Sequence, residues 1–262
     1  LFSSYKNKQV ASYGDFSTLS FFSDKTITTG EGGMLLTNDV ELIRESNIYK
    51  HDGRKERGVD VIDKRGFNYR LTELQAAVGV AQLGKSERFI KRKKENQQLY
   101  NSFLKDVKQV KVFNFTSEGE IVPHRNILLV PKASDLIVHL VENGVGARTL
   151  FKPMHSQPCY NRTNEFQITE KLYKTGVCLP SAPSLTNDNI EYICQLIKNF
   201  TPKLGIILKT IPATRPTFSN NDISFITNNF SEILSGKSFL SQYKFCSQFE
   251  KEFASYTGSD FA

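Results

Sequence analysis

Residues 14–39, GDFSTLSFFSDKTITTGEGGMLLTND, are the stretch around which this sequence is organised. The stretch contains a single lysine, Lys25, between an apolar run and the glycine-rich turn 30–33. Residues 34–37 (MLLT) then predict a short buried strand. Short strands on both sides of a loop form a rigid frame that can hold a lysine partly out of water. Because desolvation favours the neutral amine, a lysine held in this way can attack a carbonyl group and form a Schiff base.

Two simpler interpretations of the same residues stay open on spacing alone. An isolated lysine is more often a solvated surface charge, and a Gly-x-Gly-Gly turn is more often only a tight turn. The turn is not a nucleotide loop of the G-x-x-x-x-G-K-[ST] kind, because no Lys-Ser or Lys-Thr pair follows Gly33.

The whole residue string is more specific than the spacing. Gly14-Asp15, Ser20-Phe21, Lys25 and the runs 29–34 and 37–39 resemble the lysine segment of the DegT-type sugar aminotransferases. These are pyridoxal phosphate (PLP) enzymes with the aspartate-aminotransferase fold. Residues 66–77 (GFNYRLTELQAA) resemble the next signature of that family, and residues 148–160 (RTLFKPMHSQPCY) resemble a weaker third one. The three blocks follow the family's order between residue 1 and about residue 200.

The resemblance implies an α/β fold made of parts. We expect a partial PLP-dependent transferase large domain with a mixed, mostly parallel sheet and helices, a small α+β C-terminal domain, and a helical tail. The expected boundaries are 1–95 for the C-terminal part of the large domain, 96–200 for the small domain and 201–262 for the remainder.

The tail has two interpretations. Residues 211–218 (IPATRPTF), followed by helices expected over 221–234 and about 242–256, resemble the opening of a second aminotransferase-like unit. On this interpretation residues 201–262 are a linker and the N-terminal start of that second unit. The alternative is an accessory helical extension.

Local patterns predict the remaining elements. An Asn-Asp pair at 38–39 predicts an N-cap, and residues 72–73 predict the start of a second helix. A long helix expected over about 85–107 has an apolar stripe with three-four spacing. The further expected elements are strands 110–113, 127–130 and 145–151 and helices 134–143, 164–174 and 187–199.

Roles for three residues follow from the resemblance. It implies that Lys25 carries the cofactor as a Schiff base and that Ser20 donates its hydroxyl to the PLP phosphate. It also implies that Asn68 reaches across a dimer interface to the phosphate in the neighbouring subunit, which predicts a homodimer with shared active sites. The alternatives are that Ser20 is an ordinary strand-end serine and that Asn68 is a turn-forming asparagine ahead of a helix.

Three further residues are candidates for substrate contact. His51 ends the helix that begins after Asp39, so it either touches substrate or cofactor or is a helix-terminal histidine stabilised by the helix dipole. Arg148 and His155 lie in the third block, where they would meet phosphate or sugar hydroxyls; arginine suits phosphate by its forked geometry. A surface role remains open for both.

The resemblance also implies that parts of the site are missing. In the family, the aspartate that pairs with the pyridine nitrogen comes a few residues before the position equivalent to Leu1. The turn that helps to hold the phosphate and the aromatic residue that stacks on the ring come further upstream. We therefore expect this chain to be a truncated fragment, a fusion or an assembly artefact, and to be inactive alone.

Composition narrows the possible partners. The 262 residues are 39% hydrophobic and 23% charged, which predicts a soluble globular protein without a membrane span. The formal charge of +7 is spread along the chain, and its densest run, 85–94, is predicted to be a solvated helix face. We expect an anionic small substrate rather than nucleic acid. No Cys or His spacing indicates a metal site, and the four free cysteines favour the cytoplasm.

The sequence therefore predicts PLP-dependent transfer of an amino group, with glutamate as donor, to a nucleotide-linked keto-sugar in cell-surface polysaccharide or amino-sugar biosynthesis. The related sugar 3-dehydratases lack a lysine at this position, so Lys25 argues against that reaction. A carbocyclic or non-nucleotide substrate stays open. The alternatives of a different class are a non-catalytic regulatory or assembly protein that keeps the fold, and an inactive fragment.

Overall fold

A computed structural model describes residues 1–114, 118–160, 166–200, 216–235 and 244–262. The described residues form two compact units. Unit 1 is built from described residues of Leu1–Arg88, Ser117–Val122 and Pro216–Ala262, and unit 2 from those of Phe89–Thr116 and Pro123–Arg215. Segments from both ends of the chain therefore fold together in unit 1.

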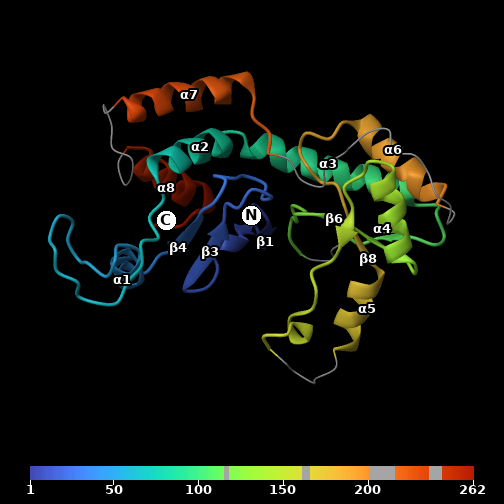
Figure 1. Ribbon diagram of the computed structural model, residues 1–262, viewed down its shortest axis with the longest axis horizontal. Helices are drawn as coiled ribbons and strands as arrows, with labels where there is room; N and C mark the ends of the chain where they lie inside the picture. The colour runs from blue at the N-terminus through green and yellow to red at the C-terminus, as the bar shows by residue number, and fades with distance from the viewer. Residues whose placement is uncertain (115–117, 161–165, 201–215, 236–243) are drawn as a thin grey trace. The chain divides into compact units, whose positions relative to one another are not determined.

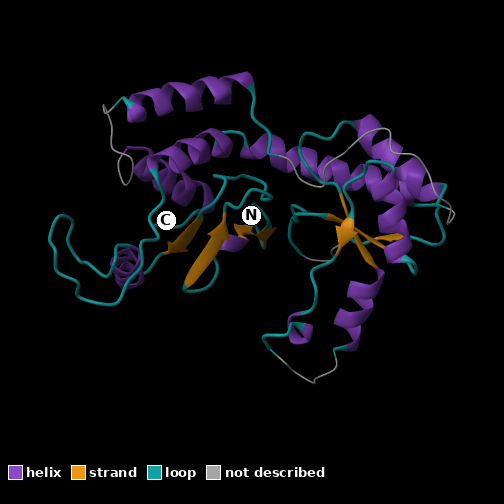
Figure 2. Cartoon of the chain, viewed as in Figure 1, coloured by secondary structure: helices purple, strands orange, loops and turns teal. Residues whose placement is uncertain are grey.

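Unit 1 contains two small hairpins and several helices (Figures 1 and 2). Its elements are β1 (Ser4–Tyr5), β2 (Lys8–Gln9), the 3₁₀ turn η1 (Val10–Ser12), β3 (Phe16–Ser20), β4 (Gly33–Thr37), α1 (Val40–Lys50), α2 (Glu73–Leu83), α7 (Asn220–Leu234) and α8 (Lys244–Thr257). Helix α3 (Ser86–Leu104) begins in unit 1 and continues into unit 2.

The strands of unit 1 pair with their neighbours in the chain. β3 and β4 are antiparallel, with Ser20 opposite Gly33 and Phe16 opposite Thr37. β1 and β2 form a second antiparallel pair. The mostly parallel sheet that the sequence predicts is not found in the described residues, where every pair of strands is antiparallel.

The last described residues of the chain add to the β3–β4 hairpin. Thr37 and Phe261 form an antiparallel bridge in which each backbone N–H donates to the other residue's carbonyl, at 3.3 and 3.2 Å. The backbone N–H of Asp260 also donates to Asn38 Oδ1 at 2.8 Å. The C-terminal segment is thus held against β4 by backbone hydrogen bonds.

Helix α2 packs against both α7 and α8 (Figure 1). Its small residues Ala76, Ala77 and Gly79 are buried, which allows close packing of the helices. At Gly79 an added Cβ would lie only 2.6 Å from the Phe249 ring, so the absence of a side chain there permits the contact. The apolar face of α8 packs into the core of unit 1, since Phe245, Phe249 and Phe253 are all buried.

A buried carboxylate joins the first turn of α2 to the start of α8. Glu73 is fully buried, and its carboxylate accepts hydrogen bonds from the backbone N–H groups of Phe245, at 2.5 Å, and Cys246, at 3.1 Å. The Sγ atom of Cys246 donates to the Leu71 carbonyl at 3.2 Å. Because the first N–H groups of a helix have no partner within it, Glu73 satisfies part of the α8 N-terminus.

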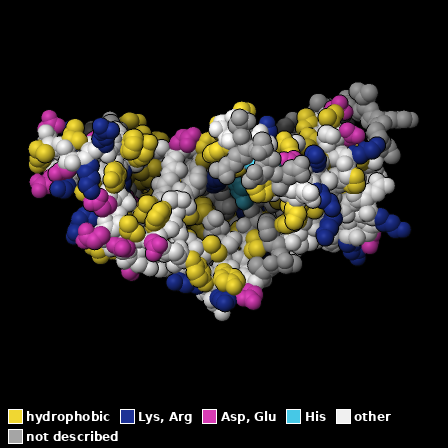
Figure 3. Space-filling model, turned by 90° about the horizontal axis from the view of Figure 1, so that it is seen from below, with side chains coloured by type: hydrophobic (Ala, Val, Ile, Leu, Met, Phe, Trp, Pro, Cys, Tyr) yellow, Lys and Arg dark blue, Asp and Glu magenta, His cyan; other side chains and the backbone are white. Residues whose placement is uncertain are grey.

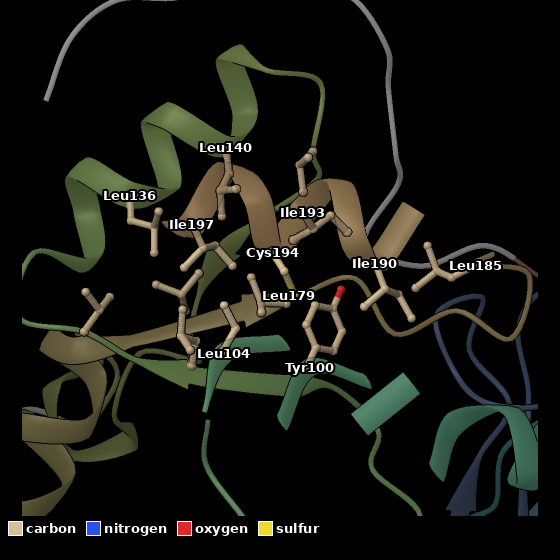
Figure 4. Packing of buried hydrophobic residues seen from close by; sticks show 14 of the residues in the cluster. Tyr100, Leu104, Leu136, Leu140, Leu179, Leu185, Ile190, Ile193, Cys194 and Ile197 are labelled. Atoms are coloured by element: carbon tan, nitrogen blue, oxygen red, sulfur yellow. The ribbon is translucent and has the colours of Figure 1, made fainter. Parts of the chain in front are cut away.

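Unit 2 is an α+β unit in which helices and one sheet pack around a single hydrophobic core (Figures 2 and 4). Its four-stranded antiparallel sheet has the order β5-β6-β8-β7. Its strands are β5 (Lys111–Val112), β6 (Asn126–Leu129), β7 (Arg148–Thr149) and β8 (Gly176–Leu179), and its other elements are α4 (Ala133–Glu142), η2 (Met154–Ser156), α5 (Gln167–Thr175) and α6 (Asn187–Lys198). The core packs side chains of α3, α4, α6 and β8, among them Tyr100, Leu136, Leu179 and Ile193 (Figure 4).

The predicted helices and strands agree with the observed ones apart from their ends, whereas β8 lies outside the predicted ranges. Positions 164–165 and 242–243 of two predicted helices lie outside the described residues. The strand expected over 145–151 is limited to Arg148–Thr149, because only these residues pair with β8. The α3 stripe buries two polar side chains as well as apolar ones. Lys93 Nζ donates to the Pro123 and His124 carbonyls at 3.1 Å each, and Asn96 Nδ2 donates to Ala182 O at 3.1 Å. Within the described ranges, no helix is long and apolar enough to cross a membrane.

Candidate active site

The loop that carries Lys25 closes on Phe21. Residues 22–29 leave the end of β3 and return, so that the Thr29 N–H and the Thr28 hydroxyl both donate to the Phe21 carbonyl, at 3.0 and 2.9 Å. The Phe21 N–H in turn donates to Gly32 O at 2.9 Å. Phe21 is fully buried. These hydrogen bonds fix the backbone where the two ends of the loop meet, and Lys25 lies within the loop.

The glycine-rich turn 30–33 follows this loop. Gly30 and Gly32 have φ angles of 83° and 143°, in the region that favours glycine. A Cβ at Gly32 would also lie 2.7 Å from Thr29 Oγ1. The Glu31 carbonyl accepts from Thr29 Oγ1 at 2.6 Å and from Gln75 Nε2 at 2.9 Å, which ties the turn to α2.

Ser20 is the last residue of β3, and Lys25 lies five residues later, in the loop that follows. The Lys25 N–H donates to Phe22 O at 3.0 Å, its side chain is one third exposed at 33%, and its Nζ is 3.7 Å from Asp24 Oδ1. Ser20 is exposed at the end of β3, where its Oγ accepts from the Phe22 N–H at 3.3 Å. A hydroxyl that accepts this bond still has its own hydrogen to donate. The end of β3 and the loop after it thus present a donor hydroxyl and an accessible amine.

His51 and Asn68 are brought together by the backbone. They form an antiparallel bridge, flanked by hydrogen bonds from Asp52 N to Phe67 O, at 2.9 Å, and from Tyr69 N to Lys50 O, at 3.1 Å. His51 is the C-cap of α1, and its N–H donates to Ile48 O at 3.2 Å. The predicted helix-terminal position of His51 is therefore confirmed, while its contact with a substrate stays a prediction.

Asn68 is exposed and belongs to a small polar network. Its Oδ1 accepts from Arg70 Nε at 2.8 Å, and Arg70 Nη2 donates to Asp52 Oδ2 at 3.2 Å. The sequence prediction missed Arg70 and Asp52. The available signal was the spacing of Asn68 and Arg70, because side chains two residues apart in extended backbone lie on the same side.

Arg148 and His155 belong to unit 2. Arg148 is exposed on β7, with its guanidinium carbon 4.7 Å from the centre of the Phe151 ring. His155 lies in η2, with Nε2 2.8 Å from Glu170 Oε1 and its ring centre 4.7 Å from that of Phe166. A substrate that binds His155 through Nε2 would have to displace Glu170. The structure does not bring these two residues into contact with each other.

The charged surface around the end of α1 is mixed in sign. Acidic and basic side chains alternate at the left of Figure 3, over α1 and the loop that follows it. The ion pairs there join Lys50 to Glu250, at 3.4 Å, and Arg54 to Asp60, at 2.7 Å; Lys64 also pairs with Glu45. Exposed pairs of this kind contribute little to stability.

Comparison with known proteins identifies close similarities. A family model described as "DegT/DnrJ/EryC1/StrS aminotransferase family" matches residues 1–198. GDP-perosamine synthase from Escherichia coli O157:H7 is 38% identical over 208 residues, which cover 76% of this chain and 55% of that protein. A putative pyridoxal phosphate-dependent aminotransferase, EpsN from Bacillus subtilis, is 30% identical over 202 residues, covering 74% of this chain and 52% of that protein.

A solved structure is similar too. The Helicobacter pylori aminotransferase PseC, described as involved in the biosynthesis of pseudoaminic acid, matches with a TM-score of 0.69 and 25% identity, covering 74% of this chain and 55% of that one. This chain spans about half the length of the curated relatives it matches.

Proposed function

Because the chain belongs to the DegT/DnrJ/EryC1/StrS aminotransferase family, which is PLP-dependent, we propose that it acts in transfer of an amino group to a nucleotide-linked keto-sugar. Its fold is that of part of an α/β PLP-dependent transferase, and its relatives are sugar aminotransferases. One relative is named GDP-perosamine synthase, and this name refers to a nucleotide-linked sugar, which supports that substrate class. Glutamate as the amino donor is part of the proposal.

The side chains of unit 1 fit the chemical groups of PLP. The amine of Lys25 suits the cofactor's aldehyde, and the hydroxyl of Ser20, at the end of the preceding strand, suits its phosphate. The single observation that carries the proposal is the short segment from Ser20 to Lys25, in which the hydrogen bonds of Phe21 fix the backbone between the two residues. When bound, PLP supplies an electron sink and a carbon that accepts the amino group.

Each of the proposed site residues would have its own role. Lys25 holds the cofactor covalently through Nζ and, once released, moves a proton as a general base and acid at the same atom. Ser20 donates a hydrogen bond to the phosphate. Arg148 and His155 would contact anionic or hydroxyl groups of the substrate, and His51 would contact the substrate or the cofactor. We assign these three roles as part of the proposal.

The proposed assembly is a homodimer with shared sites. Exposed Asn68 would donate to the cofactor phosphate bound by the neighbouring subunit. The proposal also keeps residues 201–262 as a linker and the start of a second aminotransferase-like unit; residues 201–215 and 236–243 lie outside the described residues. The cytoplasmic location stays a prediction.

The proposal is tested by a half-reaction with the protein as its gene encodes it, and its variants carry the residue numbers of the printed sequence. Incubated with PLP and glutamate, the protein is expected to form pyridoxamine phosphate and 2-oxoglutarate, both measured by chromatography. Lys25→Ala should abolish their formation, while Lys91→Ala, which removes an exposed lysine of α3, should not. Failure of the parent protein to form either product would contradict the proposal and favour a non-catalytic protein that keeps the fold.

A further inference from the structure

We infer that Arg70 is a positioning residue for Asn68, which it orients so that the amide presents its amino group as a hydrogen-bond donor to a phosphate. The inference deepens the proposed function and rests on it for the identity of that phosphate, the one carried by PLP. The geometry comes from the 2.8 Å contact between Arg70 Nε and Asn68 Oδ1.

The chemistry of this contact fixes the direction of the amide. The Nε–H of arginine only donates hydrogen bonds, so the Asn68 atom that faces it must be the carbonyl oxygen. The amino group then points the other way. Within the described ranges the Nδ2 group of Asn68 makes no hydrogen bond, and the side chain is exposed. Two N–H donors are therefore available to an anion.

Arg70 is itself held by Asp52. The Arg70 Nη2 donates to Asp52 Oδ2 at 3.2 Å, and the two side chains are 25% and 36% exposed. Asp52 has a φ of 58°, a left-handed conformation that aspartate tolerates better than most residues. The bridge between His51 and Asn68 places the two segments side by side. Asp52 thus balances the charge of Arg70 and fixes its direction.

The neighbouring aromatic residues show why Asn68 and Arg70 face each other. Phe67 and Tyr69 stack with ring centres 4.8 Å apart and planes 6° from parallel. In extended backbone, alternate residues point to opposite sides, so this stacked pair occupies one side and Asn68 and Arg70 share the other. The rival role for Arg70 is direct binding of the phosphate, which its charge would allow. Its engagement by Asn68 and Asp52 favours the supporting role.

A double-mutant cycle separates the two roles. The variants are Asn68→Ala, Arg70→Ala and the double variant, each titrated with PLP and with pyridoxal, which has no phosphate. We expect each single change to weaken PLP binding about tenfold, since hydrogen bonds to charged groups are among the stronger ones. The double variant should bind PLP no more weakly than Asn68→Ala, and pyridoxal binding should be unchanged throughout. Arg70→Lys, which keeps the charge but lacks Nε, should behave like Arg70→Ala.

Additive losses in the double variant, or full binding by Arg70→Lys, would mean that Arg70 contacts the phosphate directly and would overturn the inference. A second readout needs no cofactor: the side-chain NH₂ signals of Asn68 in a ¹⁵N–¹H spectrum, assigned by their loss in Asn68→Asp. Arg70→Ala should shift these signals, whereas Arg54→Ala, a control for another loop arginine that pairs with Asp60, should not. Unchanged Asn68 signals in Arg70→Ala would also overturn it. A shifted signal with no PLP binding by the parent protein would instead contradict the proposed function.

Discussion

The ring of Phe21 packs 5.1 Å from the ring of Phe249, centre to centre, and 5.5 Å from that of Phe253. Phe21 follows Ser20 and closes the base of the Lys25 loop, while Phe249 and Phe253 lie on α8, near the other end of the chain. Aromatic pairs at these separations add to the stability gained from burial alone. The start of the loop that carries the candidate catalytic lysine therefore packs against α8.

This packing is one part of a larger contact between the tail and unit 1. Gln82 Nε2 donates to Thr217 O at 3.0 Å, and Lys85 pairs with Asp222. The Phe2 ring lies 5.1 Å from that of Tyr256. The described tail residues therefore contribute to the core of unit 1. That residues 201–262 begin a second aminotransferase-like unit stays a prediction.

Removing the buried carboxylate of Glu73 should destabilise unit 1. Glu73→Ala would leave the N–H groups of Phe245 and Cys246 buried without their acceptor, which is expected to cost about 3 kcal/mol of unfolding free energy. The measurement is urea denaturation followed by circular dichroism. The control is Glu41→Ala, which removes an exposed carboxylate from the first turn of α1 and should cost less than about 1 kcal/mol. Equal effects of the two changes would rule out the capping role of Glu73.

A methyl group at Gly79 should disturb the contact between α2 and α8. Gly79→Ala places a Cβ 2.6 Å from the Phe249 ring, and overpacking of this kind costs about 1–3 kcal/mol, more than alanine's helix preference returns. Gly84→Ala is the matched control, since its added Cβ meets no atom closer than 3.7 Å. Both melting temperatures should be compared with the parent protein's. A lower value for Gly79→Ala that Phe249→Leu partly restores is the expected pattern; no decrease would contradict the packing described.

Alkaline pH should weaken unit 2. Burial raises the pKa of the Cys194 thiol from 9.0 to about 12, and burial also raises the pKa of Tyr100. Between pH 9 and 12 the unfolded chain loses the Cys194 proton that the folded chain retains, so stability is complete below pH 9 and falls as pH rises. The slope of unfolding free energy against pH over this interval should be smaller in Cys194→Ala. At pH 8, Ellman's reagent should label exposed Cys159 rapidly and Cys194 only on unfolding. Rapid labelling of Cys194 would contradict its burial.

Local elements of this fold are predictable from sequence because their signals are local. Asp39 caps α1 through its own carboxylate, and Thr72 forms a capping box with Gln75, so both helix starts agree with the residue pattern. The phenylalanines of α8 share a face because of their spacing. In contrast, the packing of Phe249 against Phe21 joins residues more than two hundred positions apart, and no periodicity specifies such a pair.

The residues of the candidate site also differ in how far the sequence predicts them. Ser20 and Lys25 are close in sequence, so a resemblance within one short block suffices to name them. The support for Asn68 depends on Arg70 and on Asp52, which reaches the network only because residues 51 and 68 form a bridge across a long loop. That contact is set by tertiary structure, and the sequence does not indicate it.

The most direct test of the account is to identify the lysine that binds PLP. The protein as its gene encodes it would be incubated with PLP, reduced with borohydride, digested and analysed by mass spectrometry, with Lys25→Ala as the control. We expect a pyridoxyl group on Lys25 and loss of the visible absorption band of bound cofactor in Lys25→Ala. A folded protein that carries no pyridoxyl group on Lys25, or that carries it on another lysine, would contradict the account.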